Sequence, residues 1–218
     1  MPAPFPARRS LPHRLARALP DAVSALAFLV LWCRPQWLPD DALRTAVLVM
    51  VLEFALVHAN GLLGSLALAP GARRGLRLPL LLLLGAVYAL FVAAWALQFR
   101  SAWPFVVLGW LLLSKAWALF RPLPSQDLRA SLRSEWALAS IAYIAMFTVT
   151  TLLPMPALGL GPAQVAAAGL PWERGLWLRQ PQAVAAFGAG YFVLLALARG
   201  FDWFPARRRV ATGAPCDG

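Results

Sequence analysis

Apolar residues recur along the chain in six long runs that are separated by shorter polar connections. The runs cover approximately Pro20 to Trp37, Thr45 to Leu68, Leu78 to Phe99, Trp103 to Phe120, Trp136 to Leu153 and Ala183 to Ala198. A helix rises about 1.5 Å per residue and the hydrocarbon core of a bilayer is roughly 30 Å thick, so about 20 apolar residues cross it once. The pattern predicts an all-α fold, a polytopic transmembrane helical bundle of about six spans.

A membrane-spanning β-barrel fits the pattern poorly. A barrel strand alternates apolar and polar residues, whereas the stretches Leu80 to Leu84 and Phe192 to Leu195 are apolar at every position. Lipid also offers no hydrogen-bonding partner to an open backbone, which favours helices.

The basic residues between the runs predict an orientation. Fifteen of the 20 flank one set of alternate connections, and the other five, which are Arg34, Arg44, Arg100, Arg174 and Arg179, flank the opposite set. Because positively charged flanks are retained in the cytoplasm, this bias predicts that both termini are cytoplasmic. The chain then divides into a basic tail (1–19), a six-helix membrane domain (20–201) and a second basic tail (202–218).

Composition supports a membrane location. Apolar residues form 61% of the 218 and charged residues 13%, and the mean hydropathy is +0.66, far from the composition of a soluble domain. The net charge of +11 is explained by topology and by attraction to anionic lipid headgroups, so we expect no nucleic-acid partner. Lys115 is the single lysine beside 19 arginines, which is typical of a GC-rich bacterial genome and indicates an inner membrane.

The first run has two interpretations. A basic stretch followed by the apolar segment Ala22 to Cys33 also resembles a secretory signal peptide. No small-x-small cleavage site follows it, so we interpret it as a retained helix and keep cleavage as the alternative. Cys33 then lies near the outer surface and Cys216 in the cytoplasmic tail, where the two cannot pair.

Two connections are long enough to hold structure of their own. Ser125 to Glu135 places apolar residues at helical spacing and is predicted to form an amphipathic segment along the inner membrane surface that leads into the fifth run. The outer connection, Met155 to Gln182, is interpreted as a loop on the headgroups. An outer amphipathic or re-entrant piece is its alternative.

The second run contains the strongest candidate for a functional site, because Glu53 and His58 fall within about 5 Å of the predicted bilayer centre. A charge at that depth costs about 2.5 to 3.5 kcal/mol on insertion scales, which makes such residues functional candidates. On a helical wheel Asn60 points within about 20° of Glu53, whereas His58 projects about 140° away. We therefore expect Glu53 and Asn60 to share one site facing the bundle interior and His58 to meet a different neighbour.

Lys115, in the fourth run, is predicted to lie at a depth close to that of Glu53 and to point away from a stripe of tryptophans, Trp103, Trp110 and Trp117. Two interpretations stay open: Lys115 extends to the cytoplasmic headgroups, or it pairs with Glu53. The tryptophan stripe is interpreted as a lipid-facing or packing surface.

Small residues are predicted to let helices approach closely. The candidates are Gly61, Gly64, Ser65 and Gly188. The sequence lacks a zinc-protease motif, a nucleophile elbow, a phosphate loop and a dinucleotide glycine pattern. It therefore predicts no metal site built from clustered ligands and leaves the cofactor unknown.

Three function classes remain open. The favoured one is a non-catalytic membrane or assembly component, in which the intramembrane polar residues fix helix packing. The second is a small proton-coupled transporter that uses Glu53, for which a homodimer is expected. The third is a membrane-embedded enzyme or a metal or haem protein centred on Glu53 and His58.

Overall fold

The computed structural model describes residues 10–67, 74–120, 126–169 and 180–203. Its elements are α1 (Leu11–Cys33), the short 3-10 helix η1 (Pro35–Trp37), α2 (Ala42–Ala67), α3 (Arg74–Phe99), α4 (Trp103–Phe120), α5 (Gln126–Leu152), α6 (Pro162–Ala167) and α8 (Pro181–Gly200). The described residues form helices and no strand, so the all-α prediction is confirmed for this part of the chain.

Five of these helices contain a stretch long and apolar enough to cross a membrane. The stretches are Leu11–Cys33, Ala42–Ser65, Leu78–Phe99, Leu132–Leu152 and Pro181–Gly200. In α4 the apolar stretch found among the described residues is shorter, Trp103–Ser114. These five helices are compatible with the predicted helical membrane bundle, and the number of crossings and the orientation stay predictions.

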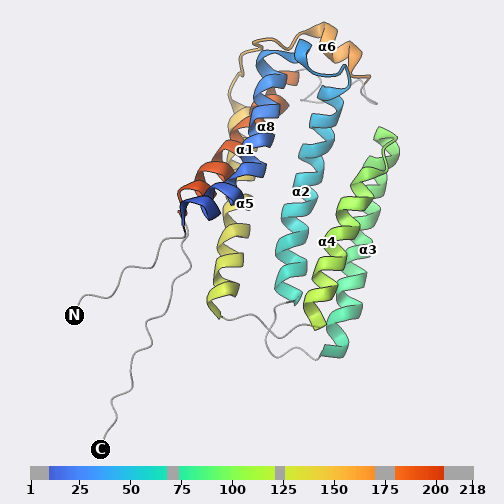
Figure 1. Ribbon diagram of the computed structural model, residues 1–218. Coiled ribbons are helices and arrows are strands. Elements are labelled where there is room, and N and C mark those ends of the chain that lie inside the picture. Colours follow the sequence, from blue (N-terminus) through green and yellow to red (C-terminus); the bar gives the residue numbers. More distant parts are fainter. Residues whose placement is uncertain (1–9, 68–73, 121–125, 170–179, 204–218) are drawn as a thin grey trace, which may run out of the picture.

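Helix α2 occupies the centre of the fold and contacts α1, α3, α4, α5 and α8. Helices α3 and α4 form an antiparallel pair on one side of α2, and α5 lies with α8 and α1 on the other side (Figure 1). Leucines cover the outer surface of α3, and on α4 the predicted stripe of Trp103, Trp110 and Trp117 is exposed. Side chains of this kind are suited to contact with lipid.

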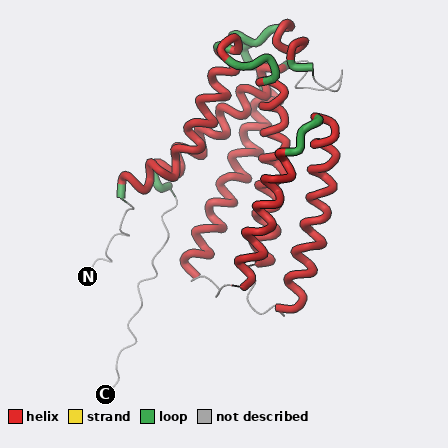
Figure 2. The backbone as a smooth tube through the Cα atoms, turned by 45° about the vertical axis from the view of Figure 1, so that its right-hand side comes forward, coloured by secondary structure: helices red, strands yellow, loops and turns green. Residues whose placement is uncertain are grey.

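Helices α1 and α8, the first and last of the described chain, pack along each other. Twelve residues of α8 are buried, most of them alanine, glycine or aromatic, because α8 is enclosed by α1, α2 and α5. Figure 2 shows that the α1–α8 pair leans away from the other helices, so that its free ends lie to one side of the bundle. At the opposite end, the Trp32 indole donates to the Pro156 carbonyl at 2.8 Å and fastens α1 to the segment before α6.

The start of α1 differs from the prediction. Helix α1 begins at Leu11, nine residues before the predicted start at Pro20. Arg14 and Arg17 precede the predicted run but belong to the helix, because each bonds to another helix. Arg14 donates to the Gly200 carbonyl at 2.7 Å, and Arg17 pairs with Glu135 at 2.5 Å.

The amphipathic segment 125–135 is a second difference, since its described part from Gln126 onward is the first part of α5 and continues into the fifth span without a break. In the outer connection, α6 is a short helix, and 170–179 lie outside the described residues.

Candidate functional site

Glu53 lies on the face of α2 that meets α8. The Tyr191 hydroxyl of α8 donates a hydrogen bond to Glu53 Oε2 at 3.2 Å. Tyr191 is buried and Glu53 is half-buried, eleven residues or about 16 Å along α2 from its start. The carboxyl group of Glu53 is therefore turned toward protein, and the phenol of Tyr191 supplies its hydrogen-bond donor.

Tyr143 brings α5 to the same place. Its hydroxyl donates to the Met50 carbonyl of α2 at 2.9 Å, one turn from Glu53. Its ring stands edge-on to Tyr191, with centroids 5.6 Å apart, and edge-on to Phe187 at 4.8 Å. Edge-to-face arrangements of this kind are the preferred geometry of aromatic pairs. Helices α2, α5 and α8 thus meet in a cluster of one carboxyl group and two phenols.

A second contact between α5 and α2 repeats this geometry one heptad away. The Trp136 indole donates to the Val57 carbonyl at 2.7 Å, seven residues from Tyr143 on α5 and seven from Met50 on α2. The two helices run antiparallel, so residues whose numbers sum to 193 lie level with each other. Both acceptors are helix carbonyls whose second lone pair is open to a side-chain donor.

An ion pair lies beyond the cluster. Asp21 of α1, which is 6% exposed, accepts a hydrogen bond from Arg199 of α8. Arg199 follows Tyr191 by eight residues, just over two turns of α8. The Asp21–Arg199 pair thus joins α1 to α8, and the Tyr191–Glu53 bond joins α8 to α2.

The helical wheel placed Glu53 and Asn60 on one face of α2. In the structure Asn60 is exposed, whereas Glu53 is half-buried. The hydrogen bond found for Glu53 comes from Tyr191, and none joins it to Asn60 in the described part of the chain. The expectation of a shared Glu53–Asn60 site stays a prediction. The side chain of Lys115 lies outside the described residues, and its pairing with Glu53 stays a prediction.

The predicted small residues lie in different environments. A methyl group added at Gly61 would overlap the Trp136 ring, and one added at Gly188 would overlap the Phe28 ring of α1. Both glycines thus allow an aromatic side chain to lie against the helix backbone. Gly64 is half-buried, whereas Ser65 is exposed and donates to the Leu62 carbonyl of its own helix at 2.8 Å.

His58 lies on another face of α2, where it is exposed. Its Nδ1 is 2.8 Å from the Phe54 carbonyl, and its ring packs against the Phe54 ring with centroids 4.2 Å apart. No contact joins it to Glu53 in the described part of the chain. Glu53 and His58 thus belong to separate environments of α2.

Sequence reasoning missed Asp21, Arg199 and the donor role of Tyr191. The sequence did contain a signal for the ion pair. Asp21 at the start of the first run and Arg199 just after the last run carry opposite charges and both lie on the predicted cytoplasmic side. Tyr191 gave no such signal, since it is an aromatic residue within an apolar run.

Among the described residues, no group of three or more histidine, cysteine, aspartate and glutamate side chains is placed to hold a metal ion. Of the two ring nitrogens of His58, Nδ1 contacts the Phe54 carbonyl, and Nε2 has no hydrogen-bond partner in the described part of the chain. A void about large enough for one water molecule lies between α2, α3 and α4, lined among others by Leu48, Phe91 and Trp95. No family model, curated protein or solved structure matches the chain.

Proposed function

We propose that the chain is a six-span protein of the bacterial inner membrane with both termini in the cytoplasm. Five long apolar helices support this, and α4, with 18 residues, spans about 27 Å, close to the thickness of the hydrocarbon core. An even number of crossings agrees with the alternation of arginines along the sequence. The inner membrane is inferred from the arginine-rich composition.

Single cysteines test this topology in a Cys33→Ser/Cys216→Ser background. Ala163→Cys, at an exposed position of α6, is expected to react with a membrane-impermeant thiol reagent in intact cells. Ala130→Cys, also exposed but near the start of α5, is expected to react only after the cells are permeabilised. Reaction of Ala130→Cys in intact cells would refute the orientation.

Within that membrane we propose a non-catalytic role as a membrane or assembly component. The observation that supports it is a set of polar side chains that join one helix to another. Tyr191 bonds Glu53, Tyr143 and Trp136 bond carbonyls of α2, and Arg199 pairs with Asp21. Interhelical hydrogen bonds of this kind fix helix packing in lipid.

The experiment that tests this role compares the wild type with Glu53→Gln, both as purified protein and in proteoliposomes. Glutamine keeps an acceptor for the Tyr191 hydroxyl, so the assembly role predicts unchanged folding and oligomeric size. It also predicts no proton flux in either protein when a pH gradient is imposed. Flux through the wild type that Glu53→Gln abolishes would refute the assembly role.

Such flux would establish the second candidate, proton-coupled transport by Glu53. One observation favours this candidate. The ion pairs Arg17–Glu135 and Asp21–Arg199 and the Glu53–Tyr191 bond succeed one another from the free ends of α1 and α8 toward mid-membrane. Titratable groups in series within a membrane are typical of proton pathways.

A further inference from the structure

His58 presents a lone pair to the outside of the bundle. A carbonyl oxygen only accepts hydrogen bonds, so the 2.8 Å contact with the Phe54 carbonyl requires Nδ1 to carry the proton. The neutral ring then has its acceptor lone pair on Nε2, which has no partner in the described part of the chain. At the proposed depth the surroundings are acyl chains, and an unsatisfied polar group there costs several kcal/mol. A ligand bound to Nε2 would remove this cost.

The hydrogen bond made by Nδ1 distinguishes His58 from a histidine that is merely exposed at a surface. Metal-ligating histidines almost always donate their other ring N–H to a carboxylate, a backbone carbonyl or water, which fixes the tautomer and raises the basicity of the ligating nitrogen. His58 has this support from Phe54, whose ring also packs against the imidazole. The imidazole is thus oriented in advance for coordination.

The neighbourhood favours a metal that brings most of its own ligands. A bare zinc ion takes four ligands, and the described residues offer no group of three. An iron porphyrin already has four nitrogens around its iron and needs one or two axial ligands. One histidine per chain satisfies that requirement, either alone or with a second copy supplying the other axial ligand.

Aromatic side chains border the exposed histidine on both sides. Phe91 of α3 packs near Phe54, with centroids 6.2 Å apart. On the other side Trp136 of α5 is fixed against Gly61, one turn from His58, by its bond to Val57. A flat apolar macrocycle placed against His58 would therefore meet rings from α3 and α5.

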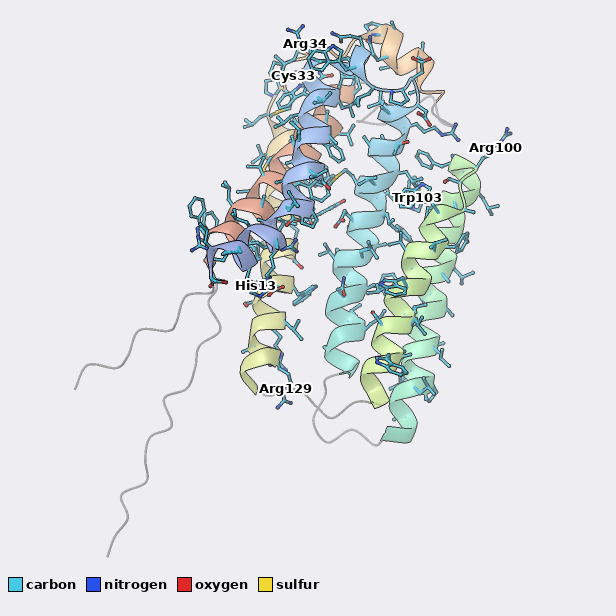
Figure 3. All side chains as sticks on the ribbon, viewed as in Figure 1. His13, Cys33, Arg34, Arg100, Trp103 and Arg129 are labelled. Carbon is cyan, nitrogen blue, oxygen red and sulfur yellow. The ribbon has the colours of Figure 1, made fainter. Side chains whose placement is uncertain are left out.

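Basic residues lie beyond this aromatic surface, toward the proposed cytoplasmic end of α5. Arg133 and Arg129 precede Trp136 by three and seven residues, which places them about 60° and 20° from it around the helix and about 4.5 and 10.5 Å further along. Arg133 is exposed and Arg129 half-buried, and neither has an ion-pair partner in the described part of the chain. Figure 3 shows Arg129 at the free end of α5.

We propose that this face binds haem, an iron porphyrin with two carboxylates on one edge. His58 Nε2 coordinates the iron, Phe54, Phe91 and Trp136 contact the macrocycle, and the carboxylates extend toward Arg133 and Arg129. Arginine pairs with carboxylates through two parallel hydrogen bonds, which suits this arrangement. The proposal needs the membrane topology proposed above but is independent of the assembly role, since Glu53 takes no part.

The experiment is a titration of the purified full-length chain, in lipid nanodiscs, with ferric haem, followed by its Soret absorption and repeated after reduction. The wild type is expected to give a shifted, saturable Soret band. His58→Ala is expected to weaken binding by more than about 100-fold, beyond the 10- to 100-fold typical of a lost supporting group. His13→Ala is the matched control, because His13 is exposed at the far end of α1 (Figure 3) and is expected to leave the titration unchanged.

Two further measurements keep the proposal testable if His58→Ala folds poorly. Imidazole added to the His58→Gly protein is expected to restore the shifted band. Haem dimethyl ester, which lacks the two negative charges, is expected to bind the wild type about tenfold more weakly, and Arg129→Gln/Arg133→Gln is expected to remove that difference. Equal Soret spectra for wild type and a folded His58→Ala protein, or no saturable band for the wild type, would overturn the proposal.

Discussion

The two tyrosines of the candidate site donate to acceptors of different kinds, which predicts unequal costs for removing their hydroxyl groups. Tyr191 donates to a carboxylate oxygen of Glu53, for which no other donor is found among the described residues. Tyr143 donates to the Met50 carbonyl, which already accepts the regular hydrogen bond of its helix. Removing a donor costs most when the acceptor is left unsatisfied.

These contacts give the magnitudes. A hydrogen bond to a charged group contributes about 1.5 to 3 kcal/mol, whereas interhelical bonds in a membrane average about 0.6 kcal/mol. The distance of 3.2 Å places Tyr191 at the weaker end of its range. Tyr191→Phe is therefore expected to lower the free energy of unfolding by about 1.5 kcal/mol and Tyr143→Phe by about 0.6 kcal/mol. The control Tyr88→Phe, at a half-buried tyrosine of α3, is expected to change it by less than about 0.5 kcal/mol.

The assay is reversible unfolding in mixed micelles, followed by circular dichroism, for the three single variants and for each one combined with Glu53→Gln. A neutral amide is a weaker acceptor than a carboxylate, so in the Glu53→Gln background the cost of Tyr191→Phe is expected to fall to that of Tyr143→Phe. The reasoning is refuted if Tyr191→Phe costs no more than Tyr143→Phe in the wild-type background, or if its cost does not depend on Glu53.

Three further changes test other contacts in the same assay. Asp21→Asn removes one half of the buried pair with Arg199 and is expected to cost about 2 kcal/mol, below the range for a fully buried pair because Arg199 is partly exposed; the double variant Asp21→Asn/Arg199→Gln should cost less, and an equal or larger cost would argue against the pair. Gly188→Ala is expected to cost about 1 to 3 kcal/mol through overlap with Phe28, whereas Gly109→Ala, with open space around it, should be neutral or stabilising. Trp136→Phe removes the bond to the Val57 carbonyl and is expected to cost about 0.6 kcal/mol; no measurable loss would show that this bond does not stabilise the contact between α5 and α2.

The hydrophobic pattern predicts the helices well because each must be apolar over the thickness of a bilayer, whatever it packs against. The start of α4 at Trp103 and its end at Phe120 coincide with the predicted run. The start of α1 does not, since Arg14 and Arg17 interrupt the apolar run in the sequence but bond to α8 and α5 in the fold. A local hydrophobic pattern does not predict that a charged residue belongs to a helix when its partner lies far away in the sequence.

The same distinction applies to the candidate site. The position of Glu53 well inside α2 follows from the hydrophobic pattern of one run, so the sequence predicts it. The contrast between the half-buried Glu53 and the exposed Asn60 depends on which helices cover α2, and these helices lie far apart in the chain. The role of Tyr191 required knowing that the last helix covers the second.

The pairing of α1 with α8 has a consequence for biosynthesis. Asp21 and Arg199 are separated by 178 residues, so at roughly 5 to 20 residues per second the ribosome needs about 10 to 40 s to supply the second after the first. During that interval Asp21 and the surface of α1 that contacts α8 have no partner from α8. A nascent chain stalled before residue 180 should therefore be degraded faster than one that has completed α8.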